Sequence, residues 1–164
     1  MRFLGLDPGL RHTGWGVITY VSGRLSYVAH GVINPPQHAP LSTRLGVLFE
    51  ELSDMIVRLT PDEAAVEETF VNQNPASALK LGMARGVVLL APAHRGLSVA
   101  EYSANRVKKA MVGSGHASKE QMMAMVARLL PTAKDVTADA ADALAVAICH
   151  AQWRQTQALW EKAS

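Results

Sequence analysis

Cysteine is almost absent from this chain, and its apolar runs are short. The 164 residues include one cysteine, Cys149, so no internal disulfide can form and a reducing compartment is expected. No apolar run approaches the ~20 residues that a membrane helix needs, and no secretory signal peptide precedes the first apolar segment. These features favour a cytoplasmic protein without a membrane segment.

An excess of charge of one sign is also missing. The 16 basic and 14 acidic residues leave a formal net charge of +2, which neither requires nor excludes a nucleic-acid partner. The sequence shows no internal repeats, linkers or low-complexity segments. We therefore expect one domain over residues 1–164, long enough for a sizeable core, with residues 155–164 as a flexible tail.

The spacing of apolar residues predicts three strands, followed by alternating helices and strands. The turn pair Ser22-Gly23 separates β-prone runs at 17–20 and 24–32, so the first three strands should be consecutive and antiparallel. A helical spacing over 41–59 ends before Pro61. The later elements are expected as strands at 64–67 and 97–102 and helices at 75–91, 104–112, 119–130 and 138–153. This order predicts an α/β fold with a five-stranded mixed sheet flanked by helices.

Four acidic residues lie at the ends of apolar segments or among alanines. Asp7 ends the opening apolar run and precedes the turn pair Pro8-Gly9. Glu67 ends a second short apolar run, and Asp139 and Asp142 lie three residues apart, on one face of the last helix. A structural role is the alternative, because Asp7 could cap a turn and Asp139 could stabilise a helix start. That alternative explains Asp142 less well, since the helix around it is largely apolar.

The types of these side chains indicate which metal they could bind. No Cys or His spacing typical of zinc accompanies the four acids, and clustered carboxylate oxygens suit Mg²⁺ or Mn²⁺. Two such ions ~3.5–4 Å apart can activate a water and stabilise the leaving oxygen of a phosphodiester. The sequence by itself does not establish that the four acids meet in space.

Five segments carry a resemblance that runs nearly end to end. They are Leu6-Asp7-Pro8-Gly9, Val66-Glu67, Ser77-Ala78-Leu79-Lys80-Leu81-Gly82 with Ala84-Arg85-Gly86, Val107-Lys108, and Ala138-Asp139-Ala140-Ala141-Asp142-Ala143-Leu144. In this order and spacing they resemble the RuvC family of Holliday junction resolvases. The resemblance implies a ribonuclease H-like fold, in which the first and fourth strands are adjacent and parallel. It also implies that Asp7, Glu67, Asp139 and Asp142 form one catalytic site holding two Mg²⁺ or Mn²⁺ ions.

The resemblance also implies partners and further site residues. A homodimer would make paired nicks in a four-way DNA junction during recombination and repair, working with a branch-migration complex of the RuvA and RuvB type. Basic residues cluster before the last helix, where phosphate contacts are expected: Arg106, Lys108, Lys109 and Lys119. Among them, the resemblance gives Lys108 and Lys119 a catalytic or DNA-binding role. Phe70, after the second acid, is expected to stack on a base, with a place in the core as the alternative.

Other functions remain open at this point. A ribonuclease H-like nuclease could act on RNA or on an RNA–DNA hybrid, and a junction-binding module could lack catalysis. The intact set of acids argues against the binding module, since clustered negative charge repels phosphate. An actin-like kinase would need a second glycine-rich phosphate hairpin, which the sequence does not show.

Overall fold

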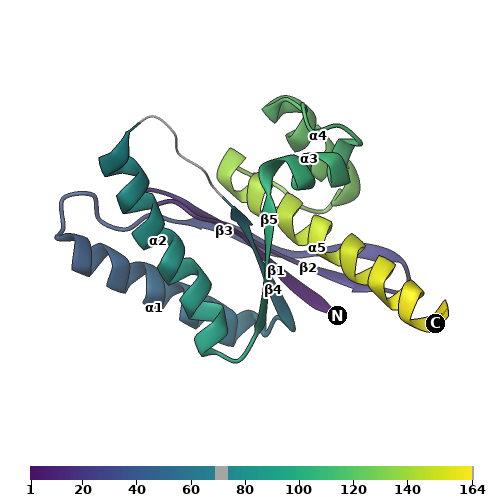
Figure 1. The fold of residues 1–164 in the computed structure, drawn as a ribbon, viewed down its shortest axis with the longest axis horizontal. Helices are drawn as coiled ribbons and strands as arrows, with labels where there is room; N and C mark the ends of the chain where they lie inside the picture. Colours follow the sequence, from purple (N-terminus) through teal and green to yellow (C-terminus); the bar gives the residue numbers. More distant parts are fainter. Residues whose placement is uncertain (69–73, 164) are drawn as a thin grey trace.

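The computed structural model describes residues 1–68 and 74–163, and within this range it shows a five-stranded sheet between two helical layers (Figure 1). The strands are β1 (Arg2–Asp7), β2 (Thr13–Val21), β3 (Arg24–Ile33), β4 (Glu63–Glu68) and β5 (Ser98–Ser103). The helices are α1 (Leu41–Leu59), α2 (Pro75–His94), α3 (Ala104–Val112), α4 (Lys119–Leu129) and α5 (Ala138–Ala163).

The strand order in the sheet is β3-β2-β1-β4-β5. β1, β2 and β3 are antiparallel neighbours, whereas β1 pairs in parallel with β4 and β4 in parallel with β5. The predicted mixed sheet with three antiparallel first strands is therefore confirmed. The parallel pairing of β1 and β4 also agrees with the fold that the resemblance implied.

Local signals in the sequence produce several of these element boundaries. Ser22 and Gly23 both have positive φ, at 49° and 83°, the conformation of the tight turns that match strand twist in a hairpin. Thr60 ends α1 in a left-handed conformation and donates its backbone N–H to the carbonyl of Ile56, directly before Pro61. Ser118 and Gln121 form the expected capping box at the start of α4.

The sheet separates two apolar cores. Along β1 the side chains alternate, so Phe3 belongs to the core under α5, whereas Leu4 and Leu6 belong to the core under α1 and α2. In β4, Ala65 faces α5, and Ala64 and Val66 face the other layer. Figure 1 shows α1 and α2 on one side of the sheet, with α3, α4 and α5 on the other.

Glycines allow α5 to lie unusually close to the sheet. A Cβ on Gly5 would meet the carbonyl oxygen of Ala143, and a Cβ on Gly14 would meet that of Asp139, both well inside contact distance. Glycine is needed at these positions because a backbone element approaches them, not because of their φ angles. This close approach brings the first turns of α5 onto β1 and β2.

Two helices extend beyond their predicted ends. α5 continues to Ala163, so the prediction of a helix end near Trp153 was wrong, and residues 155–163 are helical where a tail was expected. Residues with good helix propensity, among them Gln157, Ala158 and Leu159, follow Trp153 and explain the extension. α2 continues to His94 and contains Pro92 within its last turn, although proline at this position removes one i→i−4 hydrogen bond.

Helix α2 also qualifies the expectation about membrane segments. Within the described residues it is the one helix long and apolar enough to cross a membrane by length and composition, with a mean hydropathy of 1.3. The sequence reasoning missed it because small residues and Lys80 interrupt its apolar run. Only 22% of the most apolar 18-residue stretch of α2 is buried. The layer formed by α1 and α2 therefore presents an apolar helix surface.

Candidate active site

Three elements bring the four predicted acids to one end of the sheet. Leu6 of β1 and Val66 of β4 are partners in a parallel pair, so Asp7 and Glu67, the next residues, leave adjacent strands at the same edge. Both side chains fall on the face of the sheet covered by α5, because side chains alternate along a strand. Gly14 is the register partner of Asp7 and contacts the backbone of Asp139, which places the start of α5 over this edge.

The pKa values of these acids show that their charges interact. Burial and, to a lesser extent, the charges of Glu67, Asp142 and Asp139 together raise the pKa of Asp7 to about 8, against an opposing effect of Lys119. Burial, followed by the charge of Asp142, raises the pKa of Glu67 to about 7, while Lys108 and Lys119 lower it.

The pKa of Asp142 is also raised, first by burial. Lys119 and Lys108 lower this pKa, and the charge of Asp139 raises it. A cluster of this kind does not carry its full negative charge at neutral pH unless a cation compensates it.

Carboxylate oxygens are the ligand type that a hard divalent cation prefers, but in this structure the four carboxylates are not within coordination distance of a common point. Within residues 1–68 and 74–163, no three Asp, Glu, His or Cys side chains lie close enough together to hold a metal ion. The carboxylates are nevertheless near enough to raise each other's pKa values. Metal binding would therefore require the carboxylates to move closer together. A bound cation favours this movement because its positive charge offsets the repulsion between them.

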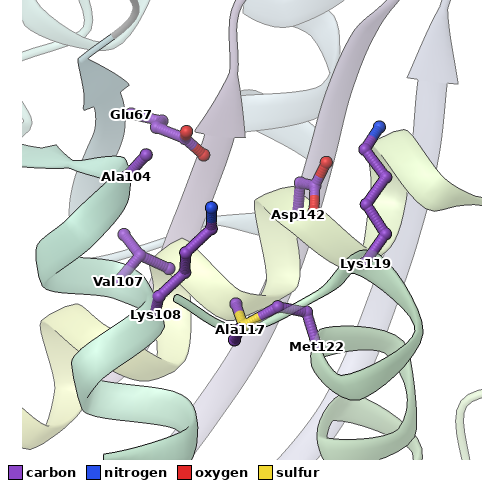
Figure 2. A pocket seen from close by; sticks show the side chains of 8 residues that line it. All are labelled: Glu67, Ala104, Val107, Lys108, Ala117, Lys119, Met122 and Asp142. Carbon is purple, nitrogen blue, oxygen red and sulfur yellow. The ribbon is translucent and has the colours of Figure 1, made fainter. Parts of the chain in front are cut away.

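A pocket of about 170 Å³ opens beside two of the acids (Figure 2). Glu67 and Asp142 present their carboxylates to it, Lys108 of α3 points its amine toward Glu67, and Lys119 lies on the side of Asp142. Its apolar lining consists of Ala104, Val107, Ala117 and Met122. The structure thus places both predicted lysines in one pocket with two of the predicted acids, and the catalytic or DNA-binding role of these lysines stays a prediction.

The other residues predicted to contact DNA are Arg106, Lys109 and Phe70. Arg106 holds its guanidinium 5.0 Å from the ring centre of Tyr102 and 5.9 Å from that of Trp153, and it does not line the pocket. Lys109 is exposed on α3 and also does not line it. Phe70 lies outside the described residues. The DNA-binding roles of these three residues stay predictions.

A second cleft, of about 490 Å³, lies on the other side of the acids, and sequence reasoning missed it. It is lined by Gly9, Leu10, Arg11, His12, Arg44, Ser77, Lys80, Leu81 and Asp139. The positions of Arg11 and His12 directly after the Asp7 turn were an available signal. Arg44 and Lys80 come from α1 and α2, so only the packed helices could bring them here.

This architecture defines a class of protein. Acids at the ends of adjacent parallel strands β1 and β4, with a final helix across them, characterise nucleases of the ribonuclease H-like fold. A solved structure titled Thermus thermophilus RuvC in complex with Holliday junction substrate superimposes with a TM-score of 0.88 at 32% identity, over 96% of each chain.

Sequence relationships then identify the family. Residues 3–150 match the family described as crossover junction endodeoxyribonuclease RuvC. Proteins of that name from Paramagnetospirillum magneticum and Azorhizobium caulinodans are 62% and 59% identical, over 96% and 97% of this chain and 95% and 94% of theirs. The chain belongs to the RuvC family. Membership confirms the resemblance and implies use of a divalent metal.

Proposed function

We propose that this protein resolves four-way DNA junctions by nicking two opposing strands symmetrically during recombination and repair. The observation that carries the proposal is the cluster of Asp7, Glu67, Asp139 and Asp142 at one edge of the sheet, in a chain of the RuvC family. The Thermus thermophilus relative, whose structure contains a Holliday junction substrate, supports the choice of substrate. Hydrolysis would leave 5′-phosphate and 3′-hydroxyl ends, as the family resemblance implies.

We propose that the four carboxylates hold two Mg²⁺ or Mn²⁺ ions. When bound, such ions supply an activated water and stabilise the leaving oxygen of the phosphodiester. The raised pKa values of Asp7, Glu67 and Asp142, caused first by burial and then by neighbouring acids, support this role, because a bound cation stabilises the ionised carboxylates against both effects.

Lys108 and Lys119 would have two effects at this site. Both lower the pKa values of Glu67 and Asp142, which favours the ionised carboxylates that bind metal. Their amines line the pocket, where they would contact the scissile phosphate. A cation in this position also counters the repulsion between the acids and the approaching DNA strand.

We propose that the active form is a homodimer that pairs through α2. Leu79, Met83 and Leu90 are 63%, 38% and 55% exposed, and their spacing places them on one stripe of the helix. An exposed apolar stripe of this kind is typical of a surface that another protein covers. A dimer supplies the two active sites that paired nicks require.

Two further parts of the proposal rest on the family resemblance and on composition. A branch-migration complex of the RuvA and RuvB type is the expected partner. A cytoplasmic location is supported by a single, buried cysteine, Cys149, which needs no oxidising compartment.

Cleavage assays with defined substrates test the function. A synthetic four-way junction, a linear duplex and an RNA–DNA hybrid are incubated with Mg²⁺, Mn²⁺ or EDTA. The proposal requires paired symmetric nicks on the junction, absent in EDTA. Preferential cleavage of the hybrid would instead identify a different ribonuclease H-like nuclease, and junction binding without cutting in either metal would identify a binding module.

A matched pair of variants tests the acid site within the same assay. Glu67→Gln should lower cleavage at least about 100-fold, since losing a ligand costs more than losing a group that supports one. Glu68→Gln is the control, because the side chain of Glu68 falls on the opposite face of β4. Equal loss in both variants would contradict the assignment of Glu67.

A further inference from the structure

A cationic cleft borders the acid cluster on the side opposite the lysine pocket. The loop after β1 supplies Arg11 and His12, α1 supplies Arg44, and α2 supplies Ser77 and Lys80. Asp139, one of the four acids, also lines it. The cleft therefore reaches the acid cluster at Asp139, while Arg44, Ser77 and Lys80 on its wall belong to the α1 and α2 layer.

The charges that line the two cavities differ. In the lysine pocket, two carboxylates oppose two lysines. In the cleft, the basic side chains are Arg11, Arg44 and Lys80, and among the described lining residues Asp139 is the single carboxylate opposing them. An excess of positive charge with guanidinium groups favours an anion with several acceptor oxygens, of which a phosphodiester is the type that nucleic acids offer.

The loop that forms one wall is fixed by side-chain hydrogen bonds. The Thr13 hydroxyl donates to the Gly9 carbonyl at 2.6 Å and accepts from the Gly9 N–H at 3.2 Å. Nδ1 of His12 is 2.6 Å from Oδ1 of Asn34. One guanidinium nitrogen of Arg44 donates to the carbonyl of Leu10 at 3.2 Å.

Among the described residues, Arg44 also retains one unpaired hydrogen-bond donor. Its Nε is buried and has no hydrogen-bond partner within the described part of the chain. A buried donor without a partner is costly, and the residue that carries it lines the cleft. The wall is thus preorganised while part of its hydrogen-bonding capacity is unused.

We propose that this cleft binds a phosphate next to the scissile one, on the strand being cut. The inference rests on the proposed function, because it assumes that a DNA strand crosses the acids. Asp142 lines one cavity and Asp139 lines the other, so a strand over the acids meets Lys108 and Lys119 on one side and the cationic cleft on the other. The cleft positions the strand and does not touch the reacting atoms.

Junction binding in EDTA tests the proposal without requiring cleavage. Lys80→Gln and Arg11→Gln should each weaken binding of a four-way junction about 5- to 20-fold. Each should also reduce the slope of log K against log salt by about 1, as expected for one lost phosphate contact. Arg95→Gln and Arg24→Gln are controls of equal charge change, because both residues are exposed and lie outside the cleft.

A scan with neutral methylphosphonates distinguishes a local contact from the overall charge. At the phosphate that the cleft binds, the substitution should weaken binding by the wild type but add no further loss to Lys80→Gln. Additive losses at every phosphate, or effects equal to those of the controls, would overturn the proposal. Failure of the wild type to bind the junction at all would instead refute the proposed function.

Discussion

At the scale of single residues, the ionisation of Asp7 links pH, stability and metal binding. Its pKa is raised from 3.8 to about 8, first by burial and then by its acidic neighbours. Between these values the folded protein holds a proton that the unfolded chain has released, so stability in EDTA should fall as pH rises. Metal binding favours the ionised form and should reverse part of this loss.

Asp7→Asn should therefore stabilise the metal-free protein at pH 8.5 but change little at pH 5. The expected gain is about 1.4 kcal/mol for each unit of pKa shift that persists in solution. Thermal unfolding in EDTA at both pH values measures this gain. Asp54→Asn is the control, because Asp54 is an exposed residue of α1. A destabilised Asp7→Asn protein at pH 8.5 would contradict the repulsive cluster.

At the scale of elements, the contact of α5 with the sheet sets the position of two acids. A methyl group at Gly14 would collide with the carbonyl of Asp139, so Gly14→Ala should shift the first turn of α5. We expect at least a 10-fold loss of cleavage and destabilisation of about 1–3 kcal/mol.

Gly46→Ala is the matched control for that substitution. Gly46 lies within α1, and a Cβ there meets nothing within 4 Å. The change should leave cleavage intact and stabilise the protein by about 0.5–1 kcal/mol. Normal cleavage by Gly14→Ala would show that the acid site tolerates movement of α5.

A buried histidine of α5, His150, ties this helix to β4 and β5. Nε2 of His150 is 2.8 Å from Oε2 of Glu63, and Nδ1 is 2.7 Å from the Tyr102 hydroxyl. A carboxylate only accepts hydrogen bonds, so Nε2–H donates to Glu63 and Nδ1 accepts from Tyr102, which is the pattern of a neutral imidazole. Burial lowers the pKa of His150 despite the opposing effect of Glu63, and burial raises that of Tyr102 to about 12.

His150→Ala should destabilise the protein by about 2–4 kcal/mol, because it leaves a cavity, a Tyr102 hydroxyl without its partner and a Glu63 carboxylate paired, among the described residues, with Arg154 alone. The lowered pKa of His150 also predicts that its contribution is lost as pH falls below about 6.5, where the unfolded chain binds the proton more readily. Urea unfolding of wild type and variant from pH 5 to 8 measures both effects. His38→Ala, at an exposed position, should change neither quantity.

At the scale of the whole molecule, the exposed apolar stripe on α2 predicts self-association. Met83→Glu should dissociate the dimer, because it places a charge within an apolar interface. Sedimentation equilibrium measures the oligomeric state. Cleavage of a four-way junction carried by a small circular plasmid shows whether the two nicks are still made together. Val57→Glu on α1, where Val57 is 57% exposed, is the control. A Met83→Glu protein that remains dimeric would exclude this stripe as the interface.

Local chemistry made much of the fold predictable. The turn at Ser22-Gly23, the stop at Thr60-Pro61 and the capping box at Ser118 are decided by neighbouring residues. The ends of α2 and α5 were missed, because α2 continues through Pro92 to His94 and residues of good helix propensity follow Trp153 in α5. Only the family resemblance anticipated that β4 pairs beside β1, since that pairing joins segments about 60 residues apart.

The sequence by itself determined which groups are available: four acids at strand or helix ends, two lysines, and the order of the elements that carry them. Only the tertiary structure decided which of these groups share a surface. Parallel pairing of β1 with β4 and the close approach of α5 at Gly14 bring the acids together, and the packing of α1 with α2 adds Arg44 and Lys80. The physical reason is that burial of distant apolar faces, and not any local signal, fixes these long-range contacts.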